Sequence, residues 1–177
     1  MSCRTFQFAI ATAIVLLSGC ASMPASKPEV ASAESSCAPI SEAQVVSLFE
    51  RWNASLATGD PHQVSENYAP QSILLPTLSN QPRFTVEEKE DYFAHFLQNG
   101  PSGHIDRRFI RLGCNSAVDA GLYSFTFAKT GAVVHARYSY TYEFIDGQWL
   151  ISSHHSSAMP EPASEIIFHA DEAADHG

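Results

Sequence analysis

Positive charge is scarce in this sequence. The 10 Lys and Arg residues stand against 19 Asp and Glu, which gives a formal net charge of −9 at pH 7. Proteins that bind nucleic acid present a basic surface, so this balance argues against nucleic acid as a partner. The sequence also lacks an uninterrupted apolar run of the roughly 20 residues that a membrane-spanning helix requires.

The motifs of several enzyme classes are missing as well. The chain contains no Gly-x-Ser-x-Gly, His-Glu-x-x-His, Gly-x-Gly-x-x-Gly or Cys-x-x-Cys pattern, so hydrolase, zinc-protease, dinucleotide and dithiol chemistry have no support. His154 and His155 are neighbours on an expected strand and point to opposite faces, which disfavours a two-histidine metal site. We therefore expect neither a metal nor a cofactor, and motifs assign no catalytic residue.

The N-terminus has the layout of an export signal. Arg4 is the only charge before an apolar stretch at residues 6–17, which is too short for a stable transmembrane anchor. Residues 17–20 read Leu-Ser-Gly-Cys and resemble the bacterial lipobox, in which a peptidase cuts before a cysteine that carries lipid. We predict a lipoprotein signal peptide at 1–19 and lipidation of Cys20. A chance cysteine in an ordinary signal peptide is the alternative.

The segments at the two ends of the mature chain have linker-like compositions. Residues 20–39 are rich in Ala, Ser and Pro, which is typical of a flexible tether. Residue 21 is Ala rather than Asp, which by the lipobox resemblance favours the outer membrane. We therefore expect the periplasmic side of the bacterial outer membrane, with the lipid anchor as the membrane contact. Residues 162–177 read as an acidic, disordered tail.

Cysteine usage is consistent with export. Cys3 leaves with the signal peptide and Cys20 is consumed by lipid, so Cys37 and Cys114 remain of the four cysteines. In an oxidising periplasm these two are expected to form a disulfide. Two buried free thiols are the alternative.

A chain of this length is expected to form one domain, at residues 40–161, and its first half has helical patterns. Ser41 and Gln44 form a capping box ahead of apolar residues at helical spacing. Asp60 and Pro61 start a second, short helix, in which Tyr68 faces inward and which Pro70 ends. A third helix follows the capping pattern of Thr85 and Glu88 and has an aromatic inner face.

The second half alternates with the period of β-strands. Strands are predicted at 104–112, 116–128, 133–145 and 148–157, with a further short strand at 72–77. This order predicts an α+β fold, in which three N-terminal helices pack in a curved, mainly antiparallel sheet. Tyr138, Tyr140 and Tyr142 share one strand face, which is typical of a core or an interface, while Arg137 and Glu143 share the other.

Several segments carry a family resemblance. They are residues 51–53, 58–61, 74–80, 91–93, 136–138, 146–151 and 154–160, the last reading His-His-Ser-Ser-Ala-Met-Pro. Together they resemble the bacterial branch of the association-domain family, which is named for the hub of calcium/calmodulin-dependent protein kinase II. That family belongs to the nuclear transport factor 2-like superfamily, beside SnoaL-like cyclases and ketosteroid isomerase.

The resemblance implies a cone of sheet around three helices, open at one end to a pocket, and self-association through the sheet. Kinase activity is not implied, because the chain lacks a glycine-rich phosphate loop and a His-Arg-Asp loop. In the kinase hub an arginine follows the final histidine of the last strand, whereas this chain has Ser156 there. This departure argues against an acidic-ligand site of the hub type.

Six residues are candidates for the pocket. They are Arg137, His154, His155, Tyr123, Arg83 and Asn80. One of the two histidines is expected to join Arg137 and Tyr123 as an acid or base near neutral pH, and a structural histidine in the sheet is the alternative. Arg83 and Asn80 precede the third helix and close the pocket mouth, unless this is an ordinary surface turn.

Asp119 is a further candidate for chemistry. It offers a carboxylate in the expected sheet, with Asp106, Arg107 and Arg108 on a neighbouring strand. An ionised carboxylate beside an arginine accepts a proton in some enzymes, and a plain salt bridge is the alternative.

Two functions follow from these patterns. The first is an exported, lipid-anchored module that associates with copies of itself and has a pocket for a small organic ligand or a partner. The second is a cofactor-independent isomerase, cyclase or dehydratase that uses a pocket histidine or aspartate. A purely structural role in the envelope is a third reading.

Overall fold

The computed structural model describes residues 37–77 and 79–160. The predicted signal peptide, Cys20, most of the tether and the acidic tail lie outside these residues. Within the described part, no helix is long and apolar enough to cross a membrane. The same residues contain no group of three or more His, Cys, Asp or Glu side chains placed to hold a metal ion.

Three helices begin where their caps predict. In α1 (Glu42–Leu56), the Ser41 side chain accepts from the Gln44 N–H and the Gln44 side chain accepts from the Ser41 N–H. Asp60 caps the short helix α2 (Pro61–Ser65). In α3 (Val86–Phe96), Thr85 and Glu88 form the second capping box. A 3₁₀ turn (Leu97–Asn99) follows and ends at Gly100, whose φ of 62° suits glycine.

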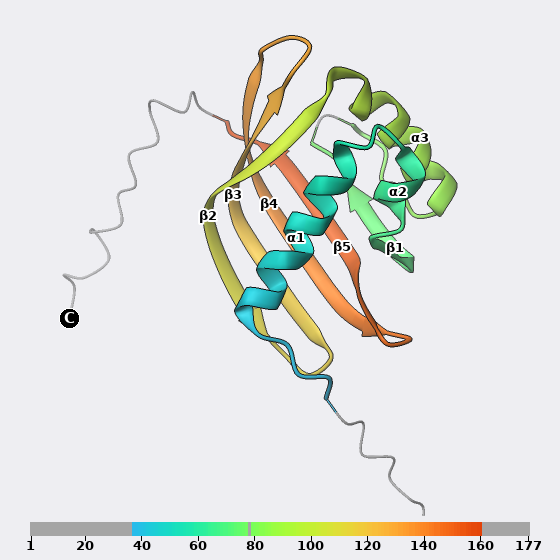
Figure 1. Ribbon diagram of the computed structural model, residues 1–177, viewed down its shortest axis with the longest axis vertical. Coiled ribbons are helices and arrows are strands. Elements are labelled where there is room, and N and C mark those ends of the chain that lie inside the picture. Colours follow the sequence, from blue (N-terminus) through green and yellow to red (C-terminus); the bar gives the residue numbers. More distant parts are fainter. Residues whose placement is uncertain (1–36, 78, 161–177) are drawn as a thin grey trace, which may run out of the picture. The chain divides into compact units, whose positions relative to one another are not determined.

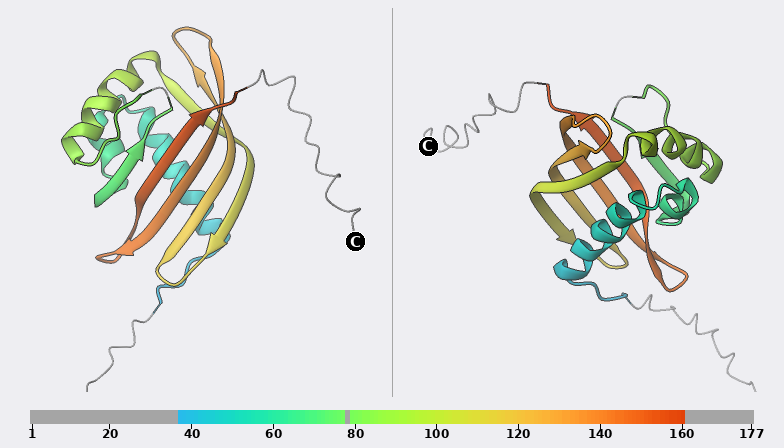
Figure 2. Two further views of the ribbon diagram at one scale, coloured as in Figure 1. Left: turned by 180° about the vertical axis from the view of Figure 1, so that it is seen from behind. Right: turned by 45° about the horizontal axis from the view of Figure 1, so that its top comes forward.

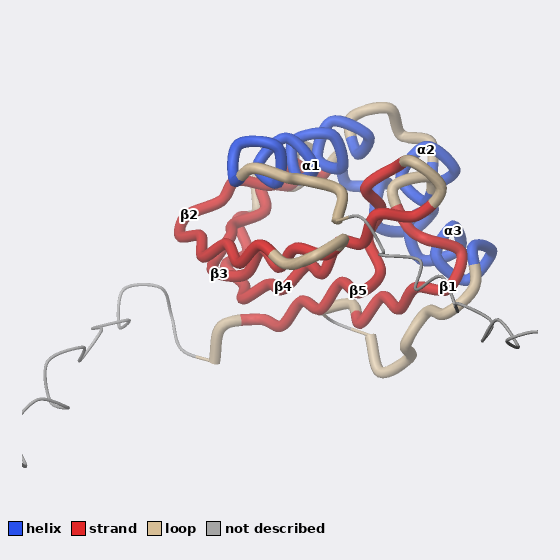
Figure 3. Tube along the Cα trace, turned by 90° about the horizontal axis from the view of Figure 1, so that it is seen from below, coloured by secondary structure: helices blue, strands red, loops and turns tan. Residues whose placement is uncertain are grey.

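The strands form one five-stranded sheet. They are β1 (Tyr68–Leu75), β2 (Pro101–Leu112), β3 (Ser116–Phe127), β4 (Val133–Ile145) and β5 (Gln148–Ala158). The order is β1-β5-β4-β3-β2, with β1 parallel to β5 and the other neighbours antiparallel. All three helices lie over one face of the sheet (Figures 1 and 3), which confirms the predicted α+β fold class.

The predicted boundaries were wrong around Tyr68 and at the start of β2. Tyr68 does not continue the second helix, because α2 ends at Ser65 and Tyr68 is the first residue of β1. Pro70 therefore lies inside a strand. That strand is at the edge of the sheet, where a missing N–H need not break the ladder. Strand β2 begins at Pro101 rather than at residue 104.

The helix-covered face of the sheet carries an aromatic core. Tyr138, Tyr140 and Tyr142 point to this face and are buried, as the stripe on their strand predicts. Trp52 of α1 lies among them, and its ring contacts those of Tyr140 and Phe125. Burial of such large rings contributes favourably to folding.

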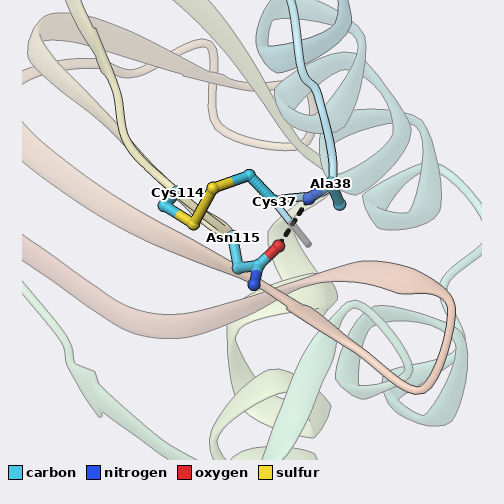
Figure 4. The surroundings of a disulfide bond; sticks show 4 residues. All are labelled: Cys37, Ala38, Cys114 and Asn115. Carbon is cyan, nitrogen blue, oxygen red and sulfur yellow. Dashed lines mark hydrogen bonds between the residues drawn. A yellow bond between two sulfur atoms is a disulfide. The ribbon is translucent and has the colours of Figure 1, made fainter. Parts of the chain in front are cut away.

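The predicted disulfide joins Cys37 to Cys114 (Figure 4). It ties the segment before α1 to the turn between β2 and β3. Beside it, the Ala38 N–H donates to the Asn115 Oδ1 atom at 2.6 Å. The domain therefore has a covalent link between its first described residue and the sheet.

We predict that the double variant Cys37→Ala, Cys114→Ala unfolds more easily than the wild type. The cysteines are 77 residues apart, and opening a loop of that length lowers the free energy of unfolding by about 4 kcal/mol in the chain-entropy description. Urea denaturation with and without reductant measures this. Reductant should destabilise the wild type to the level of the variant and leave the variant unchanged; equal stability of all four samples would contradict the prediction.

Candidate functional site

A cavity of about 410 Å³ lies between α3, β1 and the adjoining parts of β3, β4 and β5. Its volume is that of a site for a small organic molecule. Aromatic and aliphatic side chains make up most of the wall, with a few polar groups among them. The lining residues are Trp52, Leu74, Pro76, Thr77, Ser79, Arg83, Tyr92, Phe93, His95, Phe96, Asn99, Tyr123, Phe125, Phe127, Val134, Ala136, His154 and Ser156.

A chain of hydrogen bonds sets the state of His154. The Trp52 Nε1–H donates to the Tyr68 hydroxyl at 3.1 Å, and that hydroxyl lies 2.8 Å from His154 Nδ1. With the phenolic proton in this bond, both the hydroxyl and Nδ1 are paired, whereas the opposite direction would leave that proton without an acceptor among the described residues, so we assign the proton to the bond with Nδ1. Burial raises the pKa of Tyr68 well above its ordinary value, which keeps that proton in place. His154 therefore accepts at Nδ1 and, when neutral, carries its proton on Nε2.

His154 is a neutral donor rather than a proton shuttle. Burial, with a smaller contribution from His155, lowers the pKa of His154 to about 3. The ring is thus uncharged near neutral pH, which does not favour the expected role of an acid or base there. Its Nε2 atom is buried and has no hydrogen-bond partner among the described residues. A buried donor without a partner is costly.

Three hydroxyl groups line the wall beside His154. The Tyr123 hydroxyl donates to Ser156 Oγ at 2.5 Å, and Ser156 also pairs with the Thr77 hydroxyl. Burial raises the pKa of Tyr123 well above its ordinary value, so it stays a neutral phenol. The group offers fixed, uncharged hydrogen-bonding positions.

Arg83 brings a positive charge to the cavity. Its backbone pairs with Leu74 through two hydrogen bonds of 2.9 Å, which fix the segment between β1 and α3 against the sheet. Its Nη1 atom forms an ion pair with Asp91 at 3.0 Å, whereas its Nε atom is buried without a partner among the described residues. The guanidinium lies 6.0 Å from the centre of the Tyr92 ring.

Lys89 holds the same segment from inside. Its side chain is fully buried, and Nζ donates to the backbone oxygens of Ser72, Phe84 and Thr85. These three bonds join the end of β1 to the start of α3. The position of Arg83 therefore depends on a buried ammonium from the first turn of α3.

Three of the six predicted pocket residues line the cavity, and three do not. Arg83, Tyr123 and His154 are part of its wall. Arg137 is exposed and donates to the Ala158 backbone oxygen at 3.3 Å, and His155 and Asn80 are exposed as well. The pocket assignment of these three was wrong.

Strand parity gives the physical reason for two of these errors. The large rings of Tyr138 and Tyr140 occupy the covered face of β4. Arg137 directly precedes Tyr138 on the strand, so its side chain must point to the opposite, outer face. His155 is likewise opposite to buried His154. Asn80 is the third residue outside the wall, and its neighbour Ser79 lines the cavity instead.

Asp119 forms a structural ion pair away from the cavity wall. It is fully buried, accepts from Arg108 Nε at 3.0 Å and from the Tyr138 hydroxyl at 2.8 Å. Burial raises the pKa of Asp119, opposed by its hydrogen bond to Tyr138 and by Arg108. The salt-bridge alternative is the one that the structure contains.

The aromatic wall of the cavity was not predicted from the sequence. Phe93 and Phe96 come from α3, and Phe125 and Phe127 from β3. The two strand residues share the parity of Tyr123, and this alternation was the available signal. The helical pair was predicted to face inward, but not toward a cavity.

Comparisons with known proteins agree with this geometry. The sequence model of the calcium/calmodulin dependent protein kinase II association domain matches residues 41–160. A structure from Xanthomonas campestris, described as such an association domain, is 51% identical, with a TM-score of 0.66 over 71% of this chain and 96% of that chain.

More distant structures share the fold alone. A nuclear transport factor 2-like protein from Pseudomonas putida is 14% identical, with a TM-score of 0.60 over 70% of this chain and 89% of that chain. A protein with a cystatin-like fold from Nostoc punctiforme is also 14% identical, with a TM-score of 0.60 over 72% and 98%. A comparison with the curated proteins finds no match. The family match and the 51% relative show that the chain belongs to the calcium/calmodulin dependent protein kinase II association domain family.

Proposed function

We propose that this protein is a lipid-anchored, self-associating module of the bacterial envelope whose cavity binds a small organic ligand. The observation that carries the binding function is the cavity of about 410 Å³, whose mostly aromatic and aliphatic wall includes the polar side chains of Arg83, Tyr123 and His154. A concave, largely apolar site with a few polar groups is the usual form of a small-molecule site.

Binding is better supported than proton-transfer catalysis. A general acid or base needs a pKa near the working pH, and the pKa of His154 is about 3. No Asp or Glu is among the described lining residues. His95, the other lining histidine, lies exposed on the last turn of α3 with its Nδ1 atom at 2.9 Å from the Asp91 backbone oxygen.

Self-association is proposed through the outer face of the sheet. The family is named for an association domain, which supports oligomerisation as the shared role. Figure 2 (left) shows this face without a helix of the described chain over it. Phe109 and Val133 are large apolar residues exposed at 63% and 53%, and both belong to strands of this sheet. Burying such side chains against a second copy would remove apolar surface from water.

We predict that the neutral probe N-phenyl-1-naphthylamine binds the lipid-free mature chain and gains fluorescence there. Val134→Trp should weaken this binding at least tenfold, because Val134 lines the cavity and the larger ring fills it. Val133→Trp is the matched control, because Val133 is exposed on the other side of the strand. Fluorescence titration measures both. Equal binding by the two variants, or none by the wild type, would count against a ligand cavity.

Lipid anchoring gives a second prediction. Cys20→Ser in the full-length chain should abolish metabolic labelling with palmitate and release the protein from membranes, because the acylated thiol is lost. Cys3→Ser is the control and should leave both readouts unchanged, since Cys3 lies in the predicted signal peptide. Continued labelling and membrane retention of Cys20→Ser would rule out this anchor.

Self-association gives a third prediction. The lipid-free mature chain at tens of micromolar should have a mass above that of a monomer by light scattering. Phe109→Glu places a charge on the outer face and should shift the mass toward the monomer, whereas Thr130→Glu in the exposed turn before β4 should not. A monomeric wild type at these concentrations would contradict the proposal.

A further inference from the structure

Two exposed arginines stand on the outer face of the sheet. Arg137 of β4 directly precedes buried Tyr138 and so points outward. Arg111 of β2 pairs with Val118 of β3, which in the same way precedes buried Asp119, and cross-strand partners share a face. Neither arginine forms an ion pair with an Asp or Glu of residues 37–77 and 79–160.

Most exposed carboxylates of the described chain lie on the other side of the sheet. On the outer face, Asp106 accepts from the Ser124 hydroxyl near one end, and Glu143 pairs with Ser116 near the other. The three rows of paired residues between these ends include both arginines and contain no Asp or Glu. Five carboxylates belong to or flank the helices, namely Glu42, Glu50, Glu66, Glu87 and Glu90.

Apolar side chains lie between the two arginines. Val118, Ala120 and Leu122 of β3 are half-buried, and Phe109, which pairs with Ala120, is exposed. No helix of the described chain covers this face, as Figure 2 (left) shows. A partner that fits these rows therefore combines negative charge with apolar side chains.

The segment after the sheet has this composition. Residues 161–177 contain five Asp and Glu and no Lys or Arg, and the apolar residues 166–168 stand between Glu165 and Asp171. This segment lies outside the described residues, and its composition alone predicts a disordered tail. We infer that residues 161–177 bind the outer face of the sheet of their own chain and compete there with a second copy. The competition rests on the proposed self-association, whereas the binding of the tail does not.

The last described residues lie beside this face. Strand β5 ends at Ala158, and the Met159 N–H still donates to the His135 backbone oxygen of β4 at 3.2 Å. The distance across the sheet from β4 to β2 is about 10 Å at the usual spacing of strands. An extended chain advances roughly 3.5 Å per residue, so the five residues from Pro160 to Glu165 are long enough to cross it.

Intramolecular attachment makes weak contacts sufficient. Single ion pairs between exposed side chains contribute little. A short tether, however, gives the attached segment an effective concentration in the millimolar range. The tail therefore occupies the face when the protein is dilute, and a second copy displaces it only at higher protein concentration.

Fluorescence quenching within one molecule tests the binding of the tail. The lipid-free mature chain with Cys20→Ser and Ala170→Cys is labelled with bimane at residue 170, while the disulfide protects the other two cysteines. Tryptophan quenches bimane at short range. Ser139→Trp, on the outer face, should quench it at least twofold, and Ser47→Trp, on the exposed side of α1, is the matched control and should not. Submicromolar protein, with quenching unchanged on dilution, assigns the contact to the same chain.

Charge variants identify the surface. Arg111→Gln should reduce the quenching by Ser139→Trp several-fold, and high salt should do the same because exposed charges are screened. Arg51→Gln removes an equal charge from an exposed position on α1 and should leave the quenching as it is. Absent quenching, equal quenching by the two tryptophans, or equal effects of the two arginine variants would overturn the binding of the tail.

Light scattering over a range of concentrations tests the competition. The triple variant Glu165→Gln, Asp171→Asn, Glu172→Gln weakens the tail's attraction to the outer face. It should therefore self-associate at a several-fold lower concentration than the wild type.

A control removes the same number of negative charges from the helices. Glu42→Gln, Glu50→Gln, Glu66→Gln reduces general repulsion between copies equally and should shift the association much less. Equal shifts in the two triple variants would overturn the competition. If the wild type and both variants stay monomeric at every concentration, self-association fails and the competition with it, and the quenching result alone decides whether the tail binds the face.

Discussion

The hydrogen bond from Trp52 to Tyr68, continued from Tyr68 to His154, joins the parts of this domain that are far apart in the chain. Trp52 belongs to α1, Tyr68 to the edge strand β1 and His154 to the last strand. All three side chains are buried, so each bond replaces one that the group would otherwise make with water. Losing the middle member would leave two buried groups unsatisfied, and the helix, the edge strand and β5 would lose their common link.

The same chain of bonds determines what the cavity can do. A histidine held at Nδ1 by a phenol proton has its second nitrogen fixed as a donor, and burial keeps the ring neutral. The fold thus removes the one lining histidine that is deeply buried from acid–base chemistry near neutral pH. What it gains is a rigid, uncharged ring beside an aromatic wall.

Local patterns predicted most of the helices and strands, because each depends on neighbouring residues. The disulfide was predicted from the two cysteines that remain in the mature domain. Ser41 and Gln44 carry their structural signal within four positions. The start of β1 at Tyr68 could not be predicted in this way, because it depends on pairing with Ile151, which lies 83 positions further along the chain. A short apolar segment reads equally well as the end of a helix until its partner strand is known.

The cavity residues were harder to predict, and the cations show why. A charged side chain at an inward position of the sheet must bring its own partner, and Arg108 does so with buried Asp119. Lys89 is buried on α3, and its ammonium group donates to three backbone oxygens. On β4, Ala136 and Tyr138 occupy the inward positions on either side of Arg137, so Arg137 points to solvent.

Arg83 reaches the cavity by a different route, because it stands on the segment between β1 and α3 rather than inside the five-stranded sheet. Its partner Asp91 is exposed, so the buried side of the guanidinium is left with an unpaired N–H. Sequence parity cannot place a residue of this kind, since its direction is set by the bridge to Leu74 and by the bonds of Lys89. The arginine that lines the cavity is therefore the one whose position depends on tertiary contacts rather than on the strand pattern.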